Sequence, residues 1–219
     1  MEYRTLGSSG LQVSVVGLGT NNFGGRLDSK ATDAVIKRSV EQGINLLDTA
    51  NSYGDTRSEE FIGKSVKGIR DEVLLATKVA SPRGEGPNRR GASRKHVMEQ
   101  VELSLRRLQT DYIDLYQIHY PGYDVPQEEI LGPLNDLVAS GKVLAIGECN
   151  YAGWRHAHAD AVAAEITAGG GTVHAVSVDV MDSASVRRMI GTALDAEAGA
   201  PSDLQVTHWL MPFHTTAPA

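Results

Sequence analysis

The chain has 219 residues, of which 41% are hydrophobic and 22% are charged, a balance typical of a globular protein with a sizeable core. Its formal net charge of -6 argues against a nucleic acid or an anionic membrane as partner, so small ligands are the better expectation. The single cysteine, Cys149, excludes an intrachain disulfide and favours a reducing compartment. Because no apolar run approaches membrane-spanning length and no signal-peptide pattern is present, we expect a cytoplasmic protein.

The first predicted element is a small hairpin over residues 4–14, followed by a regular alternation of apolar strands and amphipathic helices. Strands are predicted over residues 15–20, 44–50, 72–79, 111–119, 143–150 and 173–180. Helices are predicted over residues 29–42, 58–66, 93–108, 126–140 and 183–194. Most of the strands are apolar throughout and therefore covered on both faces, which favours a parallel α/β sheet.

An open doubly wound sheet and a closed barrel both fit this alternation. Polar residues follow the apolar runs of four predicted strands, at Asp48, Lys78, His119 and Asn150. In a barrel these carboxyl ends converge on one mouth, where functional groups collect, whereas an open sheet spreads them along an edge. The pattern therefore favours a barrel.

Residues 3–154 resemble the aldo-keto reductase family, which has a (β/α)8 TIM barrel and uses a nicotinamide cofactor. The matching motifs occur in the family's order along the chain. They are GLGTNNFGG from Gly17, DTANSYG from Asp48, ATK from Ala76, QIH from Gln117 and GKVLAIG from Gly141. The resemblance implies a partial or rearranged barrel, with about five family-like units and an atypical C-terminal segment.

The same resemblance implies four catalytic residues, which are Asp48, Tyr53, Lys78 and His119. It also implies a set of cofactor contacts. These are Gly19, Thr20, Asn21, Asp48, Cys149 and Asn150. The family has a serine where this chain has Cys149, and a thiol is a weaker hydrogen-bond donor than a hydroxyl.

The C-terminal part departs from the family pattern, so we divide the chain into a barrel portion, residues 1–154, and an atypical segment, residues 155–219. Residues 160–196 resemble a fragment of a short-chain dehydrogenase, in which Asp179 and Val180 would lie beside the cofactor's adenine. The tail, residues 197–219, shows no clear period.

The four residues suggest a mechanism for reducing an aldehyde or ketone. Such a reaction needs a hydride donor and an acid that protonates the oxygen, and Tyr53 is the candidate acid. Lys78 would favour the ionised phenol, and Asp48 would keep the buried lysine charged. His119 would orient the substrate oxygen or share in proton delivery. The hydride would come from NADPH, the usual donor of the family, with NADH as the alternative.

A different class of function also fits the sequence. Five barrel units leave strand edges unpaired, so a catalytically silent fragment would act as a binding or assembly module and would favour homo-oligomers. A third, less favoured hypothesis is that the C-terminal strand and helix replace the missing units in a hybrid site.

Several other patterns are weaker. The run from Gly17 to Asn22 lacks the third glycine of a dinucleotide fingerprint, and His156 and His158 have the wrong spacing for one helix face, so no metal site is expected. Cys149 fits a buried structural cysteine better than a reactive thiol. The arginine-rich loop over residues 81–94 is interpreted as a solvated surface loop, and a lid that attracts anionic substrates is the alternative.

Overall fold

The structure, a computed structural model, describes residues 1–7, 9–120, 125–149 and 175–177. A two-stranded antiparallel hairpin, β1 (Tyr3–Thr5) and β2 (Gln12–Ser14), precedes a six-stranded sheet. The strands of this sheet are β3 (Leu18–Gly19), β4 (Leu46–Asp48), β5 (Leu74–Val79), β6 (Ile113–Ile118), β7 (Val143–Glu148) and β8 (Ala175–Ser177). The predicted hairpin is thus present, and the strand predicted over residues 173–180 is confirmed at its centre.

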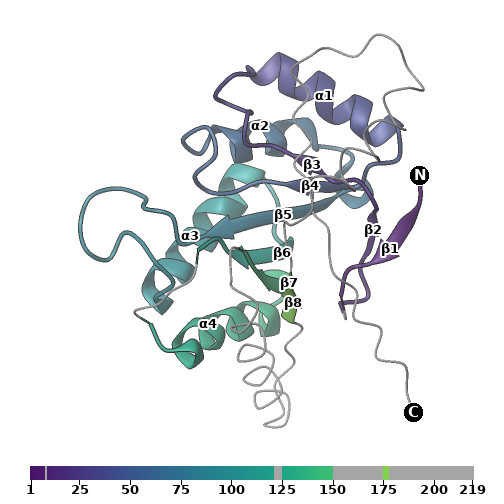
Figure 1. The fold of residues 1–219 in the computed structure, drawn as a ribbon. Coiled ribbons are helices and arrows are strands. Elements are labelled where there is room, and N and C mark those ends of the chain that lie inside the picture. Colours follow the sequence, from purple (N-terminus) through teal and green to yellow (C-terminus); the bar gives the residue numbers. More distant parts are fainter. Residues whose placement is uncertain (8, 121–124, 150–174, 178–219) are drawn as a thin grey trace, which may run out of the picture.

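All neighbouring strands of the large sheet are parallel, and their order in space is their order in the sequence (Figure 1). A doubly wound sheet reverses this order at a switch point, whereas the wall of a barrel advances in one direction. The described strands therefore wind as a barrel wall does. The predicted boundary between residues 154 and 155 lies outside the described residues.

Helices follow four of the sheet's strands along the chain, because parallel neighbours need a crossover connection from one end of the sheet to the other. They are α1 (Ser29–Glu41), α2 (Arg57–Ser65), α3 (Arg94–Leu108) and α4 (Gln127–Ala139), with a 3-10 turn at Arg70–Glu72. Each lies within about two residues of its prediction, since local signals fix its ends. Asp28 caps α1 by accepting from Ala31 N at 2.8 Å, and Gly43 follows its end at φ +84.

Alternate residues of the strands face two different layers. The larger core lies between the sheet and its helices, and includes Leu47, Leu75 and Tyr116. The second, smaller core lies on the opposite face and joins strand residues Leu46 and Ala76 to the hairpin. This two-sided burial explains why the strands are apolar throughout.

The hairpin lies at the amino ends of the large sheet's strands. Asn45, directly before β4, accepts from Ser14 N at 2.8 Å and donates through Nδ2 to Gln12 O at 2.9 Å. Leu6 and Val13 of the hairpin segment then pack in the smaller core. The amino ends are consequently covered by apolar side chains, and the polar groups lie at the carboxyl ends.

The predicted strand over residues 15–20 is only two residues long in the structure. β3 pairs with β4 at Leu18 and Gly19 alone, and no second neighbour is described for it. An apolar run is compatible with a strand, but a strand is defined by its hydrogen bonds to a neighbouring strand. The prediction for residues 15–20 was therefore too long.

Candidate active site

The smaller core ends where the inner face of the sheet changes from apolar to polar. Leu46, Ala76 and Leu115 lie in the apolar layer. Two residues further along the same strands, the same face carries Asp48, Lys78 and Gln117, because side chains in a strand alternate with a period of two. The parallel register pairs Asp48 with Ala76, and Lys78 with Gln117, so these polar residues form adjacent rows.

Asp48 and Lys78 form a buried ion pair at the centre of this layer. Lys78 Nζ lies 2.7 Å from both carboxylate oxygens of Asp48, and the two side chains are only 1% and 2% exposed. The ammonium also donates to Thr49 O at 2.9 Å. Burial is the largest single influence on the pKa of Lys78 and lowers it, but the charge of Asp48, the hydrogen bond to Asp48 and the smaller effects of Tyr53 and Cys149 together raise that pKa above its ordinary value. The lysine therefore stays charged.

Tyr53 approaches the same ammonium from the loop after β4. Its Oη accepts from Lys78 Nζ at 3.4 Å, and Nζ lies 5.0 Å from the ring centroid. Burial raises the pKa of Tyr53, and although Lys78 lowers that pKa, the net direction is upward. This corrects the expectation that the lysine makes this phenol acidic overall: the phenol is held protonated, with a cation in place to stabilise the phenolate.

Gly54 explains why a glycine follows the tyrosine directly. It adopts φ +57, and a Cβ there would lie 2.2 Å from Phe23 O. Any other residue would push this turn away from the loop that carries Phe23. The close approach of the two loops holds Tyr53 over the end of the sheet.

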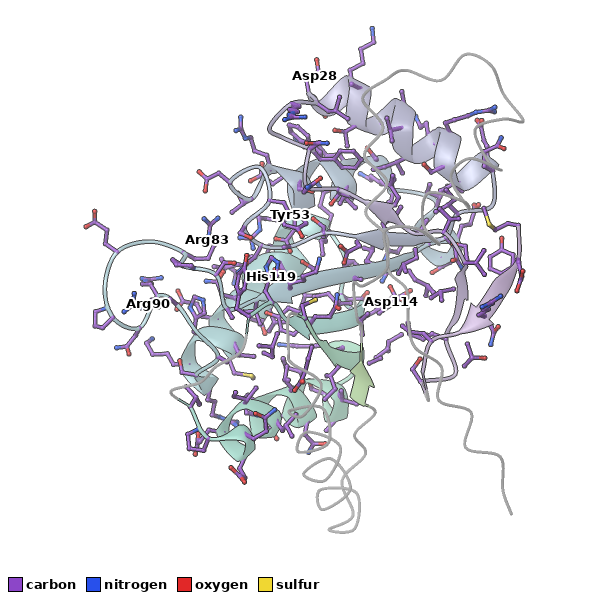
Figure 2. All side chains as sticks on the ribbon, viewed as in Figure 1. Asp28, Tyr53, Arg83, Arg90, Asp114 and His119 are labelled. Atoms are coloured by element: carbon purple, nitrogen blue, oxygen red, sulfur yellow. The ribbon has the colours of Figure 1, made fainter. Side chains whose placement is uncertain are left out.

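His119 follows β6, and its backbone N donates to Val79 O at 2.8 Å. Its ring lies edge-to-face with Tyr53, with 5.8 Å between centroids, and stacks on Tyr120 at 4.4 Å (Figure 2 labels Tyr53 and His119). Burial, helped by the charge of Lys78, lowers the pKa of His119 to about 4. The imidazole is therefore neutral at pH 7.

The sequence analysis missed a serine that contacts this histidine. Ser81 Oγ lies 3.5 Å from His119 Nδ1 and 3.3 Å from Ser52 Oγ. Ala80, immediately before it, adopts φ +103, a backbone conformation that side chains rarely take, while the Ser81 carbonyl contacts His96 Nε2 at 3.4 Å. No local sequence pattern signals this turn, because its conformation depends on tertiary contacts.

Gln117 is a second missed residue. Its Nε2 donates to Asp48 Oδ1 at 3.5 Å, and its Oε1 accepts from Cys149 Sγ at 3.4 Å. Counting by two from the apolar Leu115 would have placed it on the inner face. Burial raises the pKa of the Cys149 thiol to about 12, which fits the structural interpretation of this cysteine and not a reactive thiolate.

The predicted cofactor residues are divided in the structure. Gly19 pairs with Asp48 across the sheet, and Thr20 Oγ1 donates to Asp48 O at 2.9 Å, so both lie beside the site. Asn21 is exposed in the following turn. Three further residues with expected cofactor contacts, Asn150, Asp179 and Val180, lie outside the described part of the chain, as do His156 and His158, which were considered as metal ligands.

The described residues offer neither a metal site nor a membrane-spanning helix. The structure as far as it is described has no cluster of three His, Cys, Asp or Glu side chains suited to a metal ion. None of the helices in that same part has the length and apolarity needed to cross a bilayer.

Comparisons with known proteins agree with the motifs. The model of the Aldo/keto reductase family matches residues 15–194. This match runs through most of residues 160–196, so the comparisons do not support the resemblance of that segment to a short-chain dehydrogenase.

Among curated proteins, the aldo-keto reductase YhdN of Bacillus subtilis is 45% identical over 157 residues, covering 69% of this chain and 47% of the relative. A probable voltage-gated potassium channel subunit beta of Arabidopsis thaliana is 35% identical over 145 residues, covering 64% and 44%. The solved structure of the aldo-keto reductase AKR11C1 from Bacillus halodurans, in its holo form, has a TM-score of 0.63 and 39% identity, covering 68% of this chain and 50% of that one. The chain thus spans about half the length of these relatives.

Proposed function

The chain belongs to the aldo/keto reductase family, and on that premise we propose that it takes part in the nicotinamide-dependent reduction of aldehydes or ketones to alcohols, with Tyr53 as the general acid. The observation that carries this proposal is the contact between Tyr53 Oη and Lys78 Nζ, 3.4 Å long, on a lysine that Asp48 holds from the other side. No other phenol in the described part of the chain hydrogen-bonds to a buried ammonium.

The proton step follows from the charges around Tyr53. As hydride reaches the carbonyl carbon, negative charge develops on the oxygen, and the protonated phenol transfers its proton to that oxygen. The phenolate left behind lies beside the Lys78 ammonium, which stabilises it and cannot drift because Asp48 and Thr49 O hold it. The raised pKa of Tyr53 ensures that the proton is present at neutral pH.

His119 supplies the second polar group at the same mouth. Because its pKa is about 4, the ring is neutral and one nitrogen carries a hydrogen that can bind the substrate oxygen. Burial of the ring against Tyr120 limits its rotation. We propose that it has a positioning role and orients the carbonyl oxygen toward the Tyr53 hydroxyl, so that the proton donor and its acceptor are already aligned when the reaction begins.

The residues present fit a nicotinamide cofactor by their chemistry. NADPH, or NADH as the alternative, would supply the hydride when bound, since no side chain can donate one. Gly19, Asp48 and Cys149 border the polar layer and would line the nicotinamide end, with Asn150 next along the chain. Cys149 Sγ already donates to Gln117, so its thiol offers the cofactor a weaker contact than a hydroxyl would.

The test is the variant Tyr53→Phe, which removes one hydroxyl and keeps the ring. Turnover of an aldehyde such as 4-nitrobenzaldehyde should fall by about 10³-fold, because general acid catalysis contributes on this order. Cofactor affinity, measured by fluorescence titration with NADPH and NADH, should stay within about twofold because the phenol binds no part of it in this proposal. The matched control is Tyr112→Phe, whose ring lies over Arg70 at the other end of the sheet. Unchanged turnover in Tyr53→Phe would overturn the mechanism.

A second candidate function is a binding or assembly module without catalysis, favoured by the relative whose name is that of a potassium channel subunit beta. Titration with NADPH combined with size-exclusion chromatography separates the two. A protein that binds the cofactor and turns over aldehyde supports the reductase, whereas an oligomer that binds no cofactor supports the module.

A further inference from the structure

The loop between β5 and α3, residues 80–93, borders a pocket of about 320 Å³ that is open to solvent on one side. Backbone hydrogen bonds close this loop on itself: Arg83 N donates to Arg89 O at 2.8 Å, and Gly91 N donates to Ala80 O at 2.9 Å. Six residues line the pocket. They are Pro82, Gly84, Gly86, Pro87, Arg89 and Arg90. A curled loop with two arginines around an open pocket can receive an anionic group.

Direct contacts connect this loop to the candidate active site. Ser81, next to the first lining residue, contacts His119 Nδ1 through Oγ. Arg83 Nη1 donates to Asn51 O at 3.1 Å and contacts Asp55 Oδ1 at 3.2 Å, so its guanidinium holds both sides of the turn that carries Tyr53. In Figure 2, Arg83 and Arg90 lie on the same side of the molecule as Tyr53 and His119.

The ion pairs that the loop's arginines make are with carboxylates that are at least partly exposed to solvent. Arg83 pairs with Asp55, whose side chain is 84% exposed, and Arg89 pairs with Glu99 with both side chains partly exposed. Arg90 makes no ion pair with any residue in the described part of the chain. Because exposed ion pairs contribute about 0–1 kcal/mol, a bound anion can replace these carboxylates at little cost.

We propose that this loop, which we call the arginine loop (residues 80–93), binds a carboxylate or phosphate carried by the carbonyl substrate, with Arg90 as the principal contact and Arg83 as the inner one. The inference rests on the proposed reductase function and specifies its substrate class: carbonyl compounds with an anionic group remote from the reacting carbon. The guanidinium fork matches the oxygens of both anions in two parallel hydrogen bonds.

The test compares an anionic substrate with its neutral analogue of the same shape. 4-Formylbenzoate carries the carboxylate, and methyl 4-formylbenzoate lacks the charge. We expect kcat/KM to favour the acid by about tenfold at low ionic strength, the gain typical of one charge-assisted hydrogen bond, and the preference to shrink as salt is added. 4-Formylphenyl phosphate separates the two anions: a larger preference for the phosphate ester than for the acid would identify phosphate as the native group.

The variant Arg90→Ala should reduce the acid-to-ester preference by about tenfold, mainly through KM, because it removes binding common to ground and transition states. Arg90→Lys should restore part of the preference. The matched control is Arg94→Ala, because Arg94 lies just beyond the arginine loop at the start of α3 but pairs with Asp136 across the helices. This control should keep the preference of the natural chain.

The possible outcomes distinguish failure of the proposed anion site from failure of the proposed reductase function. Reduction of the ester without preference for the acid, or an equal loss for both substrates in Arg90→Ala, would overturn the arginine loop as an anion site and leave the reductase standing. Failure to reduce either substrate with bound cofactor would overturn the reductase itself. Melting temperatures of all variants within about 2 °C of the natural chain exclude a folding defect as the cause.

Discussion

Two buried ion pairs lie on opposite faces of β5. Two consecutive residues of this strand contact them, one pair each. Lys78 pairs with Asp48 on the inner face, while Thr77 donates to Glu59 Oε1 at 2.6 Å on the helix face. Glu59 Oε2 accepts from Arg107 Nε, also at 2.6 Å, and the carboxylate is fully buried. Distance, burial and charge type are nearly the same, yet only one pair lies at the mouth of the sheet.

What separates the two pairs is the phenol near each. Tyr53 is half-buried, and its hydroxyl contacts the ammonium. Tyr116, which feels the charges of Glu59 and Arg107, is fully buried, and its hydroxyl has no partner among the described residues. Burial raises the pKa of both phenols. A buried ion pair by itself therefore does not indicate a catalytic site. The better indication is a proton-donating group that contacts the pair and also lies at the carboxyl ends of the strands.

The largest effect expected from this comparison is on Lys78. The variant Lys78→Met removes the cation that stabilises the phenolate, and turnover should fall by about 10³-fold, the order of a removed oxyanion-stabilising group. It also leaves the buried Asp48 carboxylate without the cation that neutralises it, which costs about 3 kcal/mol of folding free energy. Steady-state kinetics and urea unfolding measure the two losses.

A double variant separates those losses. Asp48→Asn/Lys78→Met removes both charges of the inner pair and leaves neither one unneutralised, so most of the stability should return while turnover stays low. Recovery of turnover together with stability would show that the inner pair acts only in folding, like the outer one.

The variant Glu59→Gln should give the opposite result. It leaves the Arg107 guanidinium partly buried without its carboxylate, and the free energy of unfolding should fall by about 3 kcal/mol. kcat of the folded protein should stay within about twofold, because the side-chain hydrogen bonds described for this pair go to Thr77 and Ser104 and not to Tyr53, Lys78 or His119. Glu60→Gln, on the same helix but less buried, serves as the control and should cost less than about 0.5 kcal/mol. A loss of kcat as large as that of Lys78→Met would remove the distinction between the two faces.

The smallest effect at neutral pH concerns His119. Because its pKa in the folded protein is about 4, below the ordinary value of 6.5, the neutral ring persists as the pH falls, and kcat/KM should decline only on approaching pH 4, by about tenfold per unit below it. The same shift predicts stability that is complete above pH 6.5 and is lost as the pH falls toward 4. A pH–rate profile that bends near 6.5 would contradict the burial of this ring. His119→Asn should abolish the acid limb.

The site was predictable to different degrees. Asp48 and Lys78 could be placed because each interrupts an apolar strand near its carboxyl end, and parallel strands bring such ends together. Ser81 could not, since its contact with His119 depends on the strained turn at Ala80. The direction of the Tyr53 pKa was also out of reach, because opposing effects of burial and charge can be weighed only when both are known.

The sequence by itself determined the alternation of strands and helices, the ends of the helices and the residues that interrupt the apolar runs, because caps, glycines and hydrophobic periods act over a few residues. Only the tertiary structure decided which of two similar buried ion pairs contacts a phenol at the carboxyl ends of the strands. It also decided that the ion pairs of the arginine loop are made with exposed or partly exposed carboxylates. These outcomes depend on distances between residues far apart in the chain and on how much water remains around them, and neither quantity is a local property of the sequence.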